Sequence, residues 1–184
     1  MRAALLTYED LERFPEDGLR RELIGGELFV SPSPIPRHQW VAGELIAILR
    51  EHAKRNGGLA FGGPIDVIFG RSDVTAPDAI YVAPERLGQI SERGIEGPPS
   101  LIVEVLSPSN RRVDLGRKRE LYARFEVPEY WIADPKRATI ERCNNPANGR
   151  YTRIEIFNSG TMPSATIARL EVTISEVFAW PLSC

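Results

Sequence analysis

One short segment constrains the fold of this chain more than any other. Residues 100–110, SLIVEVLSPSN, place five apolar side chains around a single carboxylate, Glu104. An apolar and largely β-branched run of this kind is typical of a strand that is buried on both faces. A buried ionised carboxylate is very costly when it stands alone, so Glu104 must either lose its charge or face a partner. The segment therefore predicts a central strand that carries a polar site.

Strand-like and helix-like segments alternate around this strand. Helices are predicted at residues 7–14, 36–56 and 113–125, and Gly57-Gly58 ends the long one. Two strands flank Gly25-Gly26, which is a hairpin signal. Further strands are predicted in the segments LAF, PIDVIF, PDAIYVA, PEYWIAD, TIERC and RYTRIEIF, and a short terminal element in ISEVFAW. Because strands precede and follow the helix at 113–125, we expect an α/β fold with a central mixed sheet flanked by helices.

Composition narrows the class of protein. The 184 residues are 42% hydrophobic and 26% charged, which fits one globular domain over residues 1–184. A net charge of −2 argues mildly against a protein that coats nucleic acid, although it allows a local basic groove. Two cysteines, Cys143 and Cys184, form no disulfide framework and fit a reducing cytoplasm. No apolar stretch approaches the roughly 20 residues of a membrane span, so we expect a cytoplasmic protein without membrane contact.

A second acid, Asp78, begins the apolar strand PDAIYVA directly after Pro77. Two carboxylates on strands that enter a core could hold a divalent metal such as Mg²⁺, which prefers oxygen ligands and keeps several waters. The backbone carbonyl of Val105, next to Glu104, could add a third oxygen. The alternatives are structural: Asp78 begins a turn, as Pro-Asp often does, or each acid pairs with an arginine.

The predicted helix at 113–125 contains one charge in an unexpected place. At about 100° per residue, one stripe of this helix is apolar. Lys118 lies in the middle of the stripe, and Asp114 lies on the same side. Lys118 could extend its ammonium along apolar surface to water, and Asp114 could be the N-cap. Alternatively, the ammonium meets Glu104 and supports metal-dependent hydrolysis of a phosphodiester. The apolar stripe comprises Leu115, Leu121, Tyr122 and Phe125.

Several segments together resemble the Uma-two family, a branch of the PD-(D/E)XK or restriction-endonuclease-like superfamily. They are RRELIGGELFVSPSPIPRHQ, APDAIYV and LIVEVLSPSNRRVDLGRKRELYARFEVPEYWIADP. The resemblance runs from about Tyr8 to the last strands and is most specific over residues 99–135. It implies a restriction-endonuclease-like fold and an endonuclease that uses Mg²⁺ or Mn²⁺ to cut DNA. Since such enzymes often act as dimers, it also implies a homodimer.

The resemblance also assigns the site residues. Asp78 and Glu104 match the family's metal-binding acids. The superfamily pattern of an acid, any residue and a lysine is broken here, because Leu106 stands at the lysine position. Lys118 on the following helix matches the place from which this family supplies the lysine. The first core helix often adds a polar residue, for which His38 is preferred over Glu44, although a lone helix histidine is more often a packed or capping residue. Glu22 belongs to the family pattern without a role that spacing would assign.

Three hypotheses remain on sequence grounds. The first is a Mg²⁺-dependent endonuclease in which Asp78, Glu104, Lys118 and His38 are catalytic and Asp78, Glu104 and Val105 bind the metal. The second is a weak or inactive member of the same fold that binds nucleic acid or a protein. The third is a structural protein, which would need arginines that face Asp78 and Glu104. The displaced lysine favours the second hypothesis, and the paired acids favour the first.

Overall fold

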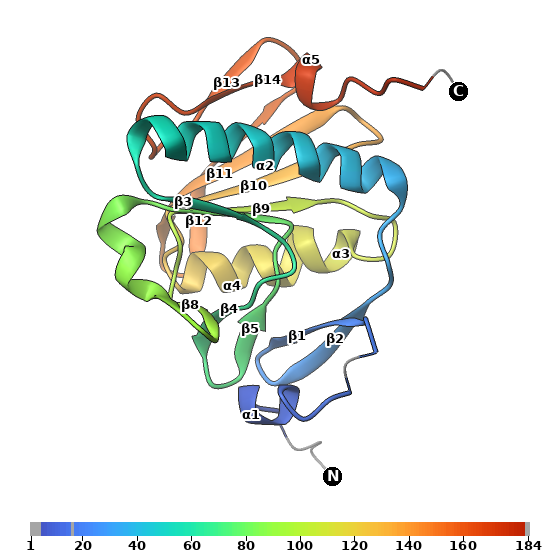
Figure 1. The fold of residues 1–184 in the computed structure, drawn as a ribbon, viewed down its shortest axis with the longest axis vertical. Coiled ribbons are helices and arrows are strands. Elements are labelled where there is room, and N and C mark those ends of the chain that lie inside the picture. The colour runs from blue at the N-terminus through green and yellow to red at the C-terminus, as the bar shows by residue number, and fades with distance from the viewer. Residues whose placement is uncertain (1–4, 16, 183–184) are drawn as a thin grey trace.

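The chain folds into two six-stranded sheets and a two-stranded ribbon, with helices packed against them (Figure 1). The computed structural model describes residues 5–15 and 17–182. One sheet, called here the central sheet, has the strand order β12-β11-β10-β9-β6-β3, and the second has the order β2-β1-β5-β4-β8-β7. The α/β class with a mixed sheet flanked by helices is confirmed. The second sheet is an addition that the sequence patterns do not predict.

The bounds of the elements follow the chain. The central sheet contains β3 (Leu59–Gly62), β6 (Ala79–Val82), β9 (Leu101–Val105), β10 (Glu129–Asp134), β11 (Thr139–Ala147) and β12 (Arg150–Phe157). The second sheet contains β1 (Arg20–Ile24), β2 (Glu27–Ser31), β4 (Val67–Gly70), β5 (Asp73–Thr75), β7 (Ile90–Ser91) and β8 (Gly94–Glu96). A separate ribbon contains β13 (Thr161–Pro163) and β14 (Glu171–Thr173). The helices are α1 (Tyr8–Leu11), α2 (Pro36–Asn56), the 3₁₀ helix η1 (Pro84–Gln89), α3 (Arg111–Val113), the π-helical turn η2 (Asp114–Lys118), α4 (Arg119–Arg124) and α5 (Ile174–Val177).

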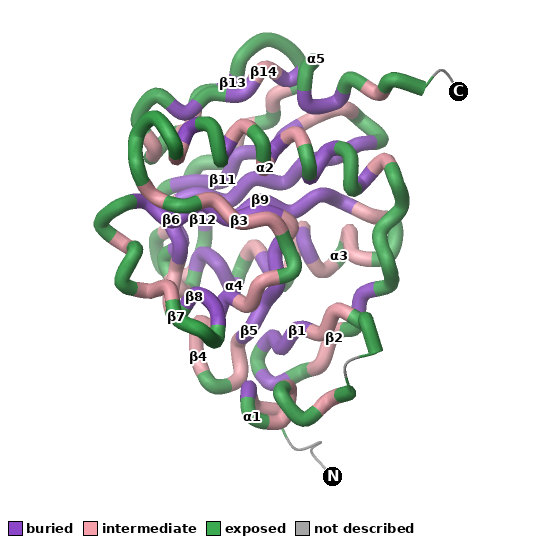
Figure 2. Tube along the Cα trace, in the orientation of Figure 1, coloured by how far each residue is buried: buried purple, intermediate pink, exposed green. Residues whose placement is uncertain are grey.

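Strand β9 is covered on both faces, as its apolar sequence predicts (Figure 2). Its residues Leu101, Val103 and Val105 face a core shared with α2, β14 and α5. Ile102 faces the opposite core, which contains the apolar residues of α4. Since side chains alternate along a strand, Glu104 shares the face of Ile102 and is directed toward the helix that carries Lys118.

The pairing of β6 with β9 brings the two predicted acids to one end of the central sheet. The strands are antiparallel, and Ala79 lies opposite Val103. Asp78, directly before β6, therefore lies beside the end of β9 that carries Glu104. The two acids were predicted on neighbouring strands; Glu104 lies in β9, and Asp78 lies one residue before the neighbouring strand β6.

The helix after β9 differs from the prediction in a way that matters for the site. It begins at Arg111, so Asp114 is not its N-cap. The middle turn, η2, has π-helical geometry and buries both Asp114 and Lys118. Such turns are rare in helices and occur frequently at functional sites.

The long helix α2 covers the opposite face of the central sheet (Figure 1). It spans Pro36–Asn56, as predicted, with a proline in its first turn. Gly57 follows it with a φ of 87°, a conformation that glycine adopts without strain. No helix among residues 5–15 and 17–182 is long and apolar enough to cross a membrane.

Another buried acid, Glu129, ties the ribbon of β13 and β14 to the central sheet. It is fully buried at the start of β10. Its carboxylate accepts hydrogen bonds from the side chains of Trp131, Ser164 and Thr166 and from the backbone N–H groups of Ala165 and Thr166, at 2.6–3.1 Å. This anchor is a part of the fold and lies outside the predicted site.

Replacing Glu129 with glutamine turns one acceptor oxygen into a donor that faces other donors. Since hydrogen bonds to a charged group contribute about 1.5–3 kcal/mol, we expect the free energy of unfolding in urea to fall by about 2–4 kcal/mol. Circular dichroism would follow the transition, with Glu171→Gln on the exposed side of β14 as the control. A loss no larger than that of the control would contradict the anchoring role.

Candidate active site

Glu104 meets the lysine that the sequence predicts. Its Oε1 accepts hydrogen bonds from Nζ of Lys118 at 2.8 Å and from the hydroxyl of Tyr122 at 3.0 Å. Its Oε2 lies 3.3 Å from a guanidinium nitrogen of Arg20. The contact between Lys118 and Glu104 is confirmed, and the alternative in which the ammonium reaches water is wrong.

Lys118 is enclosed by carboxylates. Its side chain is 1% exposed, and Nζ also lies 2.8 Å from Glu22 Oε1 and 3.4 Å from Asp114 Oδ1. Burial alone would lower the pKa of this lysine, but Glu104, Glu22 and Asp114 raise it above its ordinary value. The ammonium is therefore charged and fixed. The π-helical turn η2 contributes to this arrangement because it directs Asp114 and Lys118 into the same space.

Asp78, directly before β6, also has several polar partners. Its Oδ2 accepts a hydrogen bond from the backbone N–H of Val105 at 2.7 Å and lies 3.3 Å from Nε2 of His38. Its Oδ1 accepts a hydrogen bond from Nη1 of Arg20 at 2.8 Å. Burial opposes the charged form, but the contacts with His38, Arg20 and Val105 hold the pKa of Asp78 below its usual range. His38 thus joins the site.

The two acids share one geometric feature. Each uses one oxygen for fixed protein partners, which are Lys118 and Tyr122 for Glu104, and His38 and the Val105 N–H for Asp78. Each directs its other oxygen at the same guanidinium of Arg20. These two oxygens, Oδ1 of Asp78 and Oε2 of Glu104, are called here the outer oxygens. The guanidinium of Arg20 lies between them, and the place that it fills is called here the cation position.

Arg20 and Glu22 are the residues whose roles the sequence analysis missed. Both lie on β1, where Arg20 is 3.6 Å from Glu22, and Glu22 also accepts a hydrogen bond from the Ala76 N–H at 2.8 Å. A signal was present: Arg20, Glu22 and Ile24 alternate on one face of the strand, which places two charges on a face that also carries an apolar residue. Glu44 forms no ion pair among the described residues, which agrees with the preference for His38.

The buried cluster has more acids than bases. Four carboxylates, from Glu22, Asp78, Glu104 and Asp114, face two permanent cations, Arg20 and Lys118. Burial, reinforced by Asp114 and Asp78, raises the pKa of Glu104 to about 8. Burial also raises the pKa of Asp114 to about 6. Both carboxyls therefore hold protons more readily than free acids do, as expected where two permanent cations face four carboxylates.

This donor set fits a hard divalent cation. Mg²⁺ usually takes one or two protein carboxylates together with water and substrate oxygens. Asp78 and Glu104 each direct an outer oxygen at the cation position. A divalent cation there would add positive charge to a cluster in which carboxylates outnumber cations. Over the part of the chain that the structure describes, no group of three or more His, Cys, Asp and Glu side chains has metal-binding geometry. The site therefore suits an ion with a mostly aqueous shell better than a tightly caged one.

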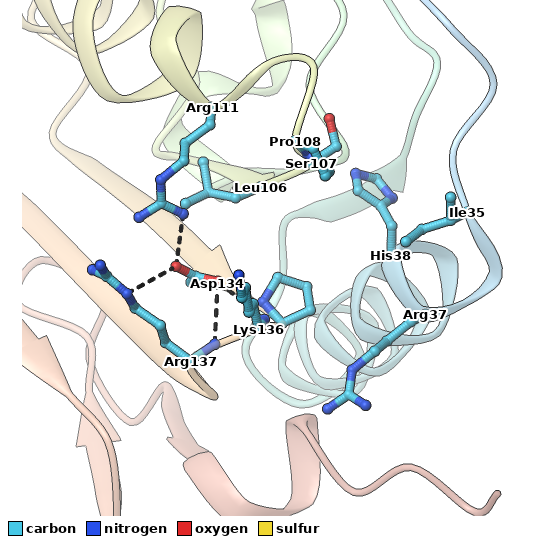
Figure 3. A pocket seen from close by; sticks show the side chains of 11 residues that line it. Ile35, Arg37, His38, Leu106, Ser107, Pro108, Arg111, Asp134, Lys136 and Arg137 are labelled. Carbon is cyan, nitrogen blue, oxygen red and sulfur yellow. Dashed lines mark hydrogen bonds and ion pairs between the residues drawn. The ribbon is translucent and has the colours of Figure 1, made fainter. Parts of the chain in front are cut away.

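A groove adjoins Asp78 and Arg20. Its first part, a cavity of about 340 Å³ called here the acid lobe, is lined by Arg20, Asp78 and His38 among others. Its second part, a cavity of about 810 Å³ called here the basic lobe, is shown in Figure 3. The two lobes have Ile35, His38, Ser107 and Pro108 in common.

The basic lobe carries excess positive charge. Arg111 pairs with Asp134 at 2.8 Å, and Arg137 lies 3.9 Å from the same carboxylate (Figure 3). Arg37 and Lys136 also line the lobe, and neither forms an ion pair with any described residue. The lobe is thus lined by four basic side chains and one acid, in a protein whose net charge is −2. This charge distribution favours an anionic ligand beside the acid cluster.

Comparisons with known proteins give the family and the fold. The family model of Uma2, described as "Putative restriction endonuclease", matches residues 7–175. A similar fold occurs in the crystal structure of "a putative nuclease belonging to DUF820 from Anabaena variabilis ATCC 29413". That structure has a TM-score of 0.80 at 21% sequence identity and covers 96% of this chain and 99% of its own. No curated protein matches the chain. At this identity, the structural likeness shows the fold alone.

The raised pKa values of Glu104 and Asp114 predict how stability depends on pH. Their ordinary values are 4.5 and 3.8, so both acids bind protons more tightly in the folded protein. Their contribution to stability is therefore complete below about pH 4 and is lost as the pH rises through 6 and then 8. Asp78 acts in the opposite direction, but only below its ordinary value.

We therefore expect the metal-free protein to melt at a lower temperature at about pH 9 than at about pH 5. Glu104→Gln stays neutral at every pH, so it should remove the larger part of this slope, at about 1.4 kcal/mol per unit of pKa difference. Melting curves at several pH values would measure it, with Glu51→Gln on the exposed side of α2 as the control. Equal slopes in wild type and Glu104→Gln would refute the assignment.

Proposed function

Because the chain belongs to the Uma2 family, we propose that it is a nuclease that hydrolyses phosphodiester bonds of DNA with a bound Mg²⁺ or Mn²⁺ ion. The observation that carries this proposal is the pair of outer oxygens. Asp78 and Glu104 aim them at the cation position, inside a cluster in which carboxylates outnumber cations. A divalent cation at that position would offset the excess of carboxylates.

The residues around the position would divide the work as follows. Asp78 and Glu104 would hold the ion, with the backbone carbonyl of Val105 as a third oxygen. When bound, such an ion polarises a phosphodiester and lowers the pKa of an attacking water. His38 and the Val105 N–H fix the orientation of Asp78.

The surroundings of Lys118 support a role in positioning the carboxylate of Glu104. Its ammonium lies behind Glu104, is 1% exposed and is surrounded by three carboxylates. It therefore holds Oε1 of Glu104 and leaves Oε2 for the ion. That the same ammonium also reaches the attacking water or the scissile phosphate stays a prediction, because this requires it to leave three acids.

The groove supports a polyanionic substrate. The basic lobe has two cations without a carboxylate partner among the described residues, Arg37 and Lys136, and it continues into the acid lobe through His38. Phosphate contacts from arginine and lysine position a nucleic acid without reading its sequence. A strand whose flanking phosphates lie in the basic lobe would bring the next phosphate toward Asp78.

One observation favours a second candidate function, a binding module without catalysis. Arg20 faces both acids, which is the arrangement that a purely structural charge cluster requires. In that case the guanidinium would permanently neutralise Asp78 and Glu104, and only the basic lobe would act, as a nucleic-acid contact. Titration calorimetry with Mn²⁺ separates the two candidates, because a permanently closed cluster binds no ion.

The substitution Asp78→Asn keeps the shape of the side chain and removes one outer oxygen charge. We expect it to reduce Mg²⁺-dependent cleavage of plasmid DNA by about 100-fold or more, because catalysis depends on the electrostatics of this position. Asp17→Asn, an exposed acid in the loop before β1, is the matched control. Cleavage at the wild-type rate by purified Asp78→Asn would remove the acid from the mechanism.

The basic lobe predicts a measurable salt dependence. In the double variant Arg37→Ala and Lys136→Ala, binding of duplex DNA should weaken about equally for all sequences. The slope of log affinity against log salt concentration should fall by about two, or about one for each lost phosphate contact. Lys54→Ala at the other end of α2 is the control. An unchanged slope in the double variant would place the DNA elsewhere.

A further inference from the structure

We propose that Arg20 is a built-in competitor of the divalent cation: its guanidinium occupies the cation position between Asp78 and Glu104, and metal binding displaces it into the acid lobe. This inference rests on the proposed function, because it concerns the same cation position. It assigns to Arg20 a regulatory role that is separate from the fixed neutralisation by Lys118.

The contacts of Arg20 are those of a bridging cation. Nη1 lies 2.8 Å from Oδ1 of Asp78, and Nη2 lies 3.3 Å from Oε2 of Glu104. The two nitrogens thus contact different carboxylates, whereas an arginine in a bidentate pair grips both oxygens of one. Both contacted oxygens are outer oxygens, so they have no other described hydrogen-bond donor. An ion that took them would have to take them from Arg20.

The position of Arg20 is poorly satisfied in one respect. Its Nε is buried and has no hydrogen-bond partner. A buried donor without a partner destabilises the arrangement that buries it. The guanidinium therefore contacts the outer oxygens while its Nε lacks a hydrogen bond. In a position where Nε could reach water or a polar atom, this destabilisation would be relieved.

The structure also offers a place for the displaced side chain. Arg20 is 21% exposed at its side chain and lines the acid lobe, a cavity of about 340 Å³. Ser31, Ser107 and Asn110 line the same cavity and supply polar atoms. Both cations contact three carboxylates, and the difference between them is exposure: the side chain of Lys118 is 1% exposed and lines no described cavity that could receive it. One cation of the cluster is fixed and the other is exchangeable.

Displacement has a thermodynamic consequence. The apparent affinity of a ligand equals its intrinsic affinity multiplied by the fraction of molecules in the binding-competent state. If Arg20 contacts both outer oxygens in most molecules, its guanidinium stabilises the metal-free cluster, and the protein binds metal weakly. Removing the guanidinium should then tighten metal binding and destabilise the metal-free protein, which are opposite effects on the two states.

The test is titration calorimetry with Mn²⁺, combined with melting curves with and without Mn²⁺, on intact wild type, Arg20→Met, Arg20→Lys and Arg21→Met. Arg21 is the neighbour on β1, pairs with Asp17 and serves as the control. We expect Arg20→Met to bind Mn²⁺ roughly tenfold tighter or more. Its melting temperature without metal should fall, and its rise upon adding metal should exceed that of wild type. Arg20→Lys keeps the charge but cannot bridge both acids, so it should bind Mn²⁺ more tightly than wild type and less tightly than Arg20→Met.

The outcomes separate the two proposals. Metal binding by wild type, with equal or weaker binding by Arg20→Met, would overturn the competitor role and leave the proposed function in place. If Arg20→Lys matched wild type while Arg20→Met bound tightly, the effect would be one of net charge alone, which would also overturn displacement. No metal binding by wild type or by any variant would overturn both. If Arg20→Met did not fold without metal, Arg20→Lys would carry the decision.

Discussion

The burial of Glu104 in a strand that is covered on both faces is the constraint on which the rest of the site depends. A carboxylate there needs charge and hydrogen bonds from the chain itself, because it is only 1% exposed in the metal-free protein. Lys118 and Tyr122 supply them from the helix, and Arg20 supplies them from β1. Bringing in Lys118 requires more acids in turn, since the ammonium is also buried. Glu22 and Asp114 meet that need, and the π-helical turn provides the space for two inward charges.

The resulting charge distribution has two opposite halves. The buried cluster has an excess of carboxylates, whereas the adjoining basic lobe has an excess of cations. A nucleic-acid strand would be attracted to the lobe and repelled from the cluster as long as the cluster remains negative. A divalent cation bound at Asp78 and Glu104 would turn the repulsion between the acid cluster and the reacting phosphate into attraction. In this view the metal requirement of the proposed activity follows from electrostatics as well as from its chemistry.

The sequence predicted those features that appear as anomalies within a regular local pattern. Glu104 breaks an apolar strand and Lys118 breaks an apolar helical stripe, so both could be found without the fold. The alternation on β1 marks Arg20 as a charge on a partly apolar face, but it does not identify the partners of Arg20, because Asp78 and Glu104 are 58 and 84 residues away along the chain. The second sheet was missed because its strands are short, with only two residues in β7 and three in β5 and β8. The single domain, the homodimer and the cytoplasmic location stay predictions.

The displaced lysine changes the groove as well as the site. In the superfamily pattern that this chain resembles, the residue two positions after the acid is a lysine, and here it is Leu106. Leu106 is 8% exposed and lines the basic lobe next to Arg111 and Asp134. Supplying the lysine from the helix therefore leaves an apolar wall where a cation would otherwise stand. At the same time the ammonium moves behind Glu104, where the substrate cannot reach it in this arrangement. Cations that contact phosphate must then come from the groove. In the proposed function, Lys118 therefore fixes Glu104 and Arg20 fills the cation position. Arg37 and Lys136 contact the nucleic-acid strand.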